Sequence, residues 1–127
     1  MPAIFNPTWE PYARAYYTAE SLGILDATHQ PMFDALHRDH LPMRTIEDLA
    51  TFHTQHGVDK AKFLAASSSF EVESKLTRSR ELVKAFGVDG TPSIIVNGKY
   101  RMTAVSAGGW DKIPELVKYL VAQESPK

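Results

Sequence analysis

Apolar residues recur at three- and four-residue steps through most of the chain, and this spacing is the period of an amphipathic helix. The pairs Thr45–Asp48 and Ser68–Glu71 are capping-box patterns at helix starts, and Gly57 and Gly87 follow apolar runs as helix-ending glycines do. The pattern therefore predicts five consecutive helices, which begin at about Thr8, Thr28, Thr45, Asp59 and Ser68, and the last of them runs to about Phe86.

The second of these helices is expected to run to Leu41, because Pro42 cannot continue it. One face is predicted to be buried and is formed by Met32, Phe33, Leu36 and His40.

The periodicity changes at the stretch GVDGTPSIIVNGKY, residues 87–100. Ile94–Val96 is a run of β-branched residues, and Asn97-Gly98 is a strong hairpin signal because both positions tolerate positive φ. A more polar strand is expected over Lys99–Ala104, and a final helix from about Asp111 is expected to bury Ile113, Leu116, Val117, Leu120 and Val121. The predicted fold class is α+β, with a helical block ahead of a β-β-α unit.

A strand with three apolar residues in a row is usually paired along both of its edges. The second hairpin strand can pair with one edge of Ile94–Val96 and leaves the other open. Ala3–Phe5, within the short apolar segment at residues 2–6, is the remaining strand candidate in the sequence. The chain thus has fewer strands than its apolar β-run requires.

Composition narrows the function classes. The formal net charge of −1 provides no basic field for a nucleic acid, and no apolar run approaches the length needed to cross a bilayer. The N-terminus lacks the basic and apolar regions of a signal peptide. The 127 residues include no cysteine, so the chain has no thiol of its own.

Histidines are the main candidates for a metal site. His37 and His40 have helical ligand spacing, as do His53 and His56, and His29 is nearby. They do not combine with Cys, Asp or Glu in a zinc pattern, so we expect no physiological metal site. His40 and His53 are expected to be buried, and His37 and His56 to face solvent.

Two other groups of residues have simpler explanations than ligand binding. Trp9, Tyr12, Tyr16 and Tyr17 have the spacing of a packed helix face, so we expect core packing rather than an aromatic ligand platform. The basic residues of 75–82 are expected to form a solvated helix face rather than an anion site.

The helical block, the segment FGVDGTP and the following SIIVNGKY together resemble the disulfide-forming oxidoreductases of the DsbA family. The resemblance extends from about Pro2 to Gln123. It implies a thioredoxin-like fold with a helical insertion. Residues 1–7 would be a remnant strand of the thioredoxin-like domain, residues 8–86 the helical insertion, and residues 87–127 the C-terminal β-β-α part.

The same resemblance assigns the substrate-binding residues. It implies that Pro92 follows a cis peptide bond and that the backbone of Thr91 pairs with extended substrate peptides, with Gly90 in the same loop. It also implies unfolded or reduced protein substrates, a membrane redox partner, a periplasmic location and no cofactor.

The chain departs from the family at its front, because the first strands and the Cys-x-x-Cys motif should precede Pro2. We therefore expect a fragment of a thiol:disulfide oxidoreductase that is itself redox-inactive, with no catalytic residue in this chain. A missing central strand would also account for the strand shortage. The open edge of Ile94–Val96 then favours self-association, through that strand or Ala3–Phe5.

Two alternatives remain open. A cysteine-less relative could hold peptides at Thr91 and Pro92 without chemistry. A glutathione-dependent relative of the kappa transferase and isomerase type would also share the insertion and the proline. That type usually carries a Phe-Trp-Gly-x-Asp-Arg run after the hairpin, and the sequence here reads YRMTAVSAGGWDK.

Overall fold

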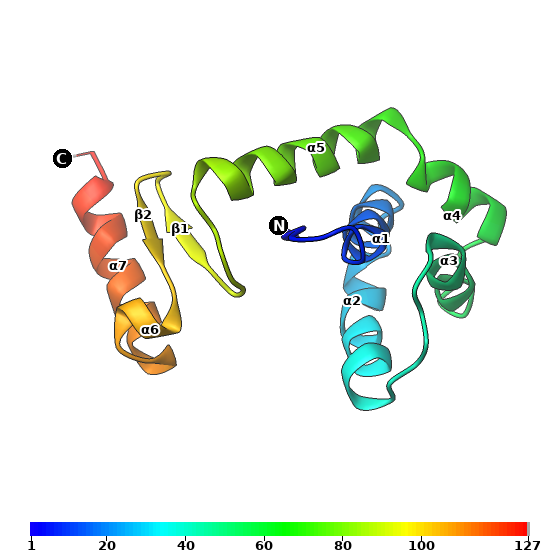
Figure 1. The fold of residues 1–127 in the computed structure, drawn as a ribbon, viewed down its shortest axis with the longest axis horizontal. Helices are drawn as coiled ribbons and strands as arrows, with labels where there is room; N and C mark the ends of the chain where they lie inside the picture. Colours follow the sequence, from blue (N-terminus) through cyan, green and yellow to red (C-terminus); the bar gives the residue numbers. More distant parts are fainter. Residues whose placement is uncertain (127) are drawn as a thin grey trace. The chain divides into compact units, whose positions relative to one another are not determined.

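The computed structural model describes residues 1–126, and Figure 1 shows the order of its elements. The helical part comprises α1 (Glu10–Ser21), α2 (Leu25–Phe33), the π-helix η1 (Asp34–Arg38), α3 (Ile46–Thr54), α4 (Lys60–Ser67) and α5 (Phe70–Ala85). Then follow β1 (Ile94–Val96), β2 (Tyr100–Met102), α6 (Ala104–Ala107), the 3-10 helix η2 (Trp110–Lys112) and α7 (Ile113–Glu124). The structure is a helix-rich α+β fold with a two-stranded sheet, as predicted.

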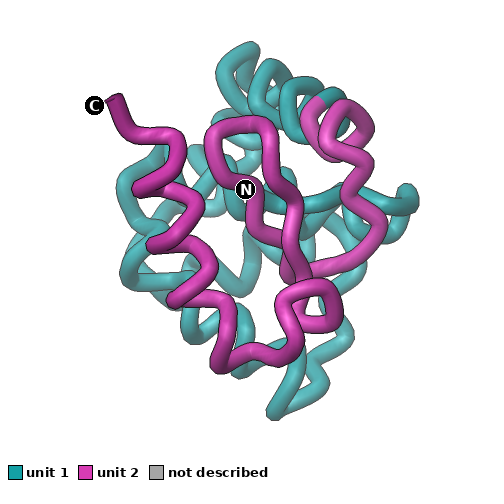
Figure 2. The backbone as a smooth tube through the Cα atoms, turned by 90° about the vertical axis from the view of Figure 1, so that its left-hand side faces the viewer, with its two compact units in different colours: residues 1–81 teal, residues 82–127 magenta. Residues whose placement is uncertain are grey.

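The chain forms two compact units, residues 1–81 and residues 82–127, which Figure 2 distinguishes by colour. The division falls inside α5. Whether residues 1–7, 8–86 and 87–127 belong to the domains that the resemblance implies stays a prediction.

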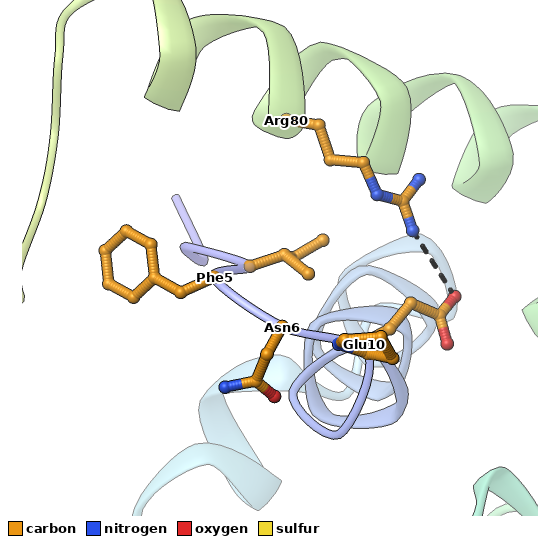
Figure 3. Close-up of a pocket in the computed structure, with 6 residues that line it drawn as sticks. Phe5, Asn6, Glu10 and Arg80 are labelled. Carbon is orange, nitrogen blue, oxygen red and sulfur yellow. Dashed lines mark ion pairs between the residues drawn. The ribbon is translucent and has the colours of Figure 1, made fainter.

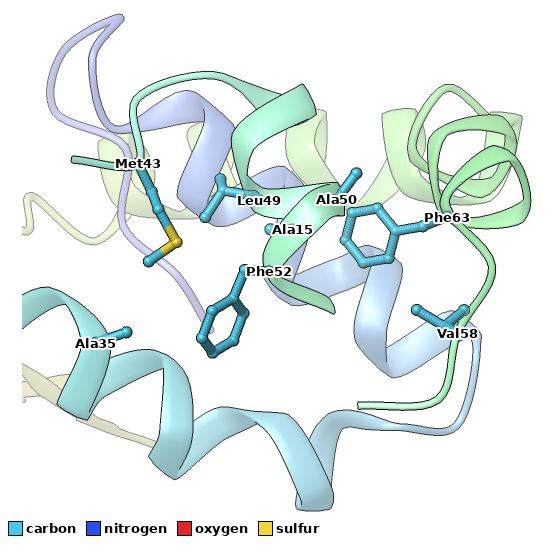
Figure 4. Close-up of a cluster of buried hydrophobic side chains, with 8 residues drawn as sticks. All are labelled: Ala15, Ala35, Met43, Leu49, Ala50, Phe52, Val58 and Phe63. Atoms are coloured by element: carbon cyan, nitrogen blue, oxygen red, sulfur yellow. The ribbon is translucent and has the colours of Figure 1, made fainter. Parts of the chain in front are cut away.

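The larger core of the first unit lies among α1, α3 and α4, which pack against one another. Leu49, Ala50 and Phe63 have no exposed surface, and Figure 4 shows their side chains converging with those of neighbouring elements. The other buried members of this cluster are Ala15, Ala35, Met43, Phe52 and Val58. Burial of these apolar side chains stabilises the helical unit.

A second cluster joins α1 to α5 through Ala13, Tyr17, Val72 and Leu76. The buried hydroxyl of Tyr17 forms a hydrogen bond with the Ser79 hydroxyl. Since a polar group that is buried without a partner is costly, this pairing lets two hydroxyls lie inside the unit.

Two of the four N-terminal caps predicted at Thr8, Thr45, Asp59 and Ser68 are present. Thr45 and Asp48 form the full capping box at α3, and the Asp59 carboxylate accepts from the Lys62 N–H at 3.0 Å. The cap of α5 was predicted one residue early, because Ser69, not Ser68, accepts from the Val72 N–H at 3.3 Å. Thr8 does not cap α1 and instead pairs with the Asn6 side chain.

The second helix differs from its prediction at both ends and on part of its buried face, although Met32 and Leu36 pack against the core as expected. It starts at Leu25, contains Pro31, and passes into the π-helix Asp34–Arg38. The wider π-turn rotates the residues beyond it away from the predicted face. His40 accordingly lies outside the helix in an exposed position with φ of 51°. Phe33, which precedes the π-helix, is 49% exposed, so both residues were wrongly expected to be inward.

The N-terminal strand prediction is also wrong. Residues 2–6 have no strand conformation, and Ile4 packs against the Tyr17 cluster instead. A strand needs a neighbour to satisfy its backbone, and within residues 1–126 no strand pairs with this segment.

The hairpin forms as predicted, with Ile94 opposite Met102 and Val96 opposite Tyr100. Asn97 and Gly98 have φ of 51° and 67°, as a turn with two left-handed residues requires. On one face Val96 and Met102 pack against Ile113 and Leu120 of α7.

The second strand is shorter than expected. It ends at Met102 because Thr103 and Ser106 form a capping box that starts α6. The final helix begins at Ile113 after a 3-10 turn, and Val121, which was expected to be inward, is 50% exposed.

Candidate functional site

The loop at residues 88–93 connects α5 to β1 and carries all three predicted substrate-binding residues. The Thr91-Pro92 peptide bond is cis, as the resemblance implies. Thr91 and Pro92 are exposed and Gly90 is half-buried. The Ser93 hydroxyl donates to the Gly90 carbonyl at 2.6 Å and closes the loop on itself.

The main chain at Thr91 is free to bind another group. Its N–H and C=O make no hydrogen bond with other residues of the described chain, 1–126. The β1 ladder starts three residues later, and β1 pairs with β2 alone in this part of the molecule. A free donor and acceptor beside an open strand edge are suited to pairing with an extended peptide.

The start of the loop is fixed at the end of α5. The Val88 N–H donates to the Val83 carbonyl at 2.9 Å and the Gly87 N–H to the Lys84 carbonyl at 3.1 Å. These two bonds form a Schellman motif, in which Gly87 takes the left-handed conformation with φ of 61°.

Arg101 of β2 reaches the same helix end. Its Nη1 atom donates to the Phe86 carbonyl at 3.1 Å and also to the Gly87 carbonyl. A cation at a helix C-terminus interacts favourably with the helix dipole. Sequence reasoning did not single out Arg101. Alternation in the predicted strand could have placed it on the face away from Met102, but not beside the end of α5.

The turn of the hairpin and the start of β2 are joined to α7 by the carboxylate of Glu124. Glu124 accepts from Asn97 Nδ2 at 2.8 Å, Lys99 Nζ at 2.7 Å and the Tyr100 hydroxyl at 3.1 Å. The hydrogen bond from the Lys99 ammonium is the main cause that lowers the pKa of Glu124.

The model of the DSBA-like thioredoxin domain family matches residues 3–121. The chain belongs to this family. The thiol:disulfide interchange protein DsbA of Pseudomonas aeruginosa is 36% identical to it over 124 residues, which are 98% of this chain and 59% of that protein.

Solved structures of DsbA proteins agree with the assignment. The crystal structure of Pseudomonas aeruginosa DsbA superposes with a TM-score of 0.90 at 36% identity, covering 98% of this chain and 65% of that one. A structure of Proteus mirabilis DsbA in complex with a noncovalently bound peptide, PWATCDS, has the same fold at 23% identity. Its TM-score is 0.80, and 94% of this chain and 66% of that one are covered.

The relation to the DsbA family favours the oxidoreductase reading over the glutathione-dependent alternative. The chain nevertheless spans about 59% of the length of the Pseudomonas aeruginosa relative, and none of its residues is a cysteine. Thiol–disulfide exchange needs a thiolate, so these 127 residues cannot perform it alone.

A separate pocket of about 430 Å³ lies in the first unit, between the N-terminal segment and α5 (Figure 3). Ile4, Phe5 and Pro7 supply its apolar wall, and Glu10 and Arg80 its charges. Glu10 is already engaged by Arg14 at 2.5 Å, and Arg80 reaches the same oxygen at 3.9 Å. This arrangement offers no nucleophile or acid–base pair.

The histidines lie apart from the loop. His53 is buried as expected, with Nδ1 2.7 Å from the Leu49 carbonyl oxygen. His37 is exposed as predicted, whereas His56 is half-buried rather than solvent-facing. Within residues 1–126, no three His, Cys, Asp or Glu side chains are placed to hold a metal ion.

The aromatic residues of α1 mostly serve packing, as predicted. Tyr17 is buried, and Tyr12 and Tyr16 pack against the two clusters. Trp9 is 39% exposed, so its predicted place in the core is wrong. In the described part of the chain, no helix combines the length and hydropathy needed to span a membrane.

Proposed function

We propose that this chain provides the peptide-binding side of a thiol:disulfide interchange protein of the DsbA family. Gly90, Thr91 and Pro92 hold an extended, cysteine-containing segment of an unfolded or reduced protein, and the exchange itself uses cysteines that are not among these residues. The observation that carries the proposal is the free main-chain N–H and C=O of Thr91 in an exposed loop of a DsbA-family chain.

Peptide pairing at this loop is supported by its chemistry. Main-chain hydrogen bonds to a strand edge provide affinity that depends little on side chains, as a protein with many substrates needs. The Proteus mirabilis DsbA complex is a precedent for noncovalent peptide binding by a protein of the same fold.

The test is a titration of the isotope-labelled chain with the peptide PWATCDS, followed by amide NMR. We expect fast-exchange shifts at Gly90, Thr91 and Ile94, with weak affinity. Thr91→Pro removes the main-chain donor at that position and should abolish the shifts. Thr91→Ala keeps the N–H and is the matched control, which should bind like the parent chain.

Two results would contradict the proposal. One is the absence of any shift at residues 90–94 in the parent chain at millimolar peptide. The other is equal binding by the Thr91→Pro and Thr91→Ala variants.

The cellular setting follows from the same proposal. Substrate proteins that acquire disulfides are found in oxidising compartments, so we propose a periplasmic location and a membrane redox partner for the protein in which this chain acts. A purely peptide-binding role, without any exchange, remains the second candidate because the chain has no cysteine.

A further inference from the structure

We propose that Arg101 is a positioning residue for peptide binding, because it fixes the start of the 88–93 loop to the hairpin that carries the loop's other end. This inference rests on the proposed function and adds a residue to it.

The hydrogen bonds of Arg101 are placed where the loop begins. A single guanidinium nitrogen donates to the carbonyls of Phe86 and Gly87, the last residues before the loop. The Schellman motif uses the carbonyls of Val83 and Lys84, so it leaves these two later carbonyls without intrahelical partners. Arg101 satisfies them with a charged donor, which gives a stronger hydrogen bond than a neutral one.

The strand position of Arg101 makes this contact a link to β1. Arg101 lies directly across from Ile95 in the antiparallel ladder, so its backbone is held by the strand into which the loop leads. The loop is thus fixed at both ends to one hairpin, at Gly87 through the guanidinium and at Ile94 through the chain itself. The Ser93–Gly90 hydrogen bond then closes the remaining residues.

The absence of a side chain at Gly87 leaves room for the Arg101 guanidinium. A Cβ atom at this position would lie 2.6 Å from Arg101 Nη1. A side chain there would require the guanidinium to shift, whereas glycine leaves it in place and adopts the left-handed conformation without steric cost.

A loop held at both ends presents the Thr91 N–H and C=O in one conformation, and binding then requires less ordering of the loop. Loss of Arg101 releases the first end from the hairpin and leaves it held by the Schellman motif of α5 alone. The free energy that orders the loop must then come from the peptide, and the affinity falls.

The experiment compares Arg101→Gln, Arg101→Lys and Lys118→Gln. Lys118 is an exposed residue of α7 with no ion pair to other residues in the range 1–126, so its variant controls for the lost charge. For Arg101→Gln we expect PWATCDS affinity to fall about tenfold, as for the loss of a charged hydrogen bond. A single nitrogen of Arg101 bonds both carbonyls, so one ammonium can replace it. The peptide affinity of Arg101→Lys should therefore lie within about threefold of that of the parent chain.

A second measurement in the free protein separates positioning from general stability. Arg101→Gln should move the amide shifts of residues 87–93 and speed their exchange, while the amides of α7 keep their protection. Unchanged loop amides, or equal affinity for Arg101→Gln and the Lys118→Gln control, would overturn the role of Arg101. If the parent chain binds no peptide, the proposed function fails, and the loop amides still decide whether Arg101 orders the loop.

Discussion

The Lys99 ammonium lies 2.7 Å from the Glu124 carboxylate, and this ion pair joins the hairpin turn to the last residue of α7. The Glu124 side chain is only 16% exposed, and it also accepts hydrogen bonds from Asn97 and Tyr100. Two donors from the turn and one from the start of β2 therefore depend on a single carboxylate.

Glu124 should make the second unit sensitive to acid. The pKa of Glu124 is lowered by its hydrogen bonds with Lys99 and Asn97, so the folded state binds fewer protons than the unfolded state. Its contribution to stability is present above the ordinary value of 4.5 and is lost as the pH falls through the folded-state pKa.

Hydrogen exchange of hairpin amides across this range should show less protection at lower pH. Glu124→Gln should weaken the dependence, and Glu115→Gln, an exposed α7 control, should leave it unchanged.

His53 should give the first unit a separate pH dependence. Burial lowers the pKa of His53 below its ordinary value of 6.5, and its ring stacks on Phe63 with centroids 4.5 Å apart. The neutral ring is favoured in the folded state, so its contribution to stability is complete above 6.5 and is lost as the pH falls through the folded-state pKa.

Urea unfolding followed by circular dichroism at several pH values between about 7.5 and 5 tests this dependence. The unfolding midpoint of the parent chain should fall with pH, and that of His53→Met should fall less. The exposed His37→Gln variant should follow the parent chain. A parent midpoint that stays constant over this range would refute the expectation.

Gly87→Ala should destabilise the end of α5 by about 1–2 kcal/mol, the cost of a left-handed conformation for a residue with a side chain. The new methyl group would also displace the Arg101 guanidinium. Gly90→Ala is the control, because no atom lies within 4 Å of its added Cβ. Hydrogen exchange of the amides near each substitution measures the local destabilisation in both variants. In an Arg101→Gln background the cost of Gly87→Ala should be smaller, and strictly additive costs would argue against the contact.

The purified chain should not catalyse disulfide exchange. It contains four methionines but no cysteine, and a thioether cannot act as the thiolate nucleophile. Oxidation of a dithiol peptide should proceed at the uncatalysed rate, with Pseudomonas aeruginosa DsbA as the positive control. A rate well above the blank would show that the expectation of redox inactivity is wrong.

The unpaired edge of β1 should promote self-association. Within residues 1–126, β1 pairs with β2 alone, and an open strand edge is a template for another chain. Sedimentation velocity at increasing protein concentration should reveal a concentration-dependent rise in mass. A compact monomer at every concentration, with slow amide exchange at Ile94–Val96, would mean that the edge does not drive assembly.

The elements that the sequence predicts well are those with strong local signals. Thr45, Asp59 and Asn97-Gly98 each act through contacts a few residues away, and all three are found as expected. The loop at Thr91-Pro92 was found by its resemblance to a family rather than by its composition.

Several errors and one omission concern positions that depend on distant parts of the chain. Ala3–Phe5 has the composition of a strand but no pairing partner in the described residues. Arg101 donates to the carbonyl of Gly87, fourteen residues earlier in the chain, and no local pattern specifies that contact. Val121 continues the apolar period of α7 but lies to the side of the face that Ile113, Leu120 and Glu124 turn toward the hairpin, so it stays exposed.

The π-helix at Asp34–Arg38 has a consequence for the comparison of homologous sequences. A π-turn holds about one residue more than the α-turn it replaces, so it can arise by the insertion of a single residue into an α-helix. Relatives with an unbroken α-helix in this region should therefore be one residue shorter. A correct alignment would place a one-residue gap between positions 34 and 38 rather than in the loop that follows.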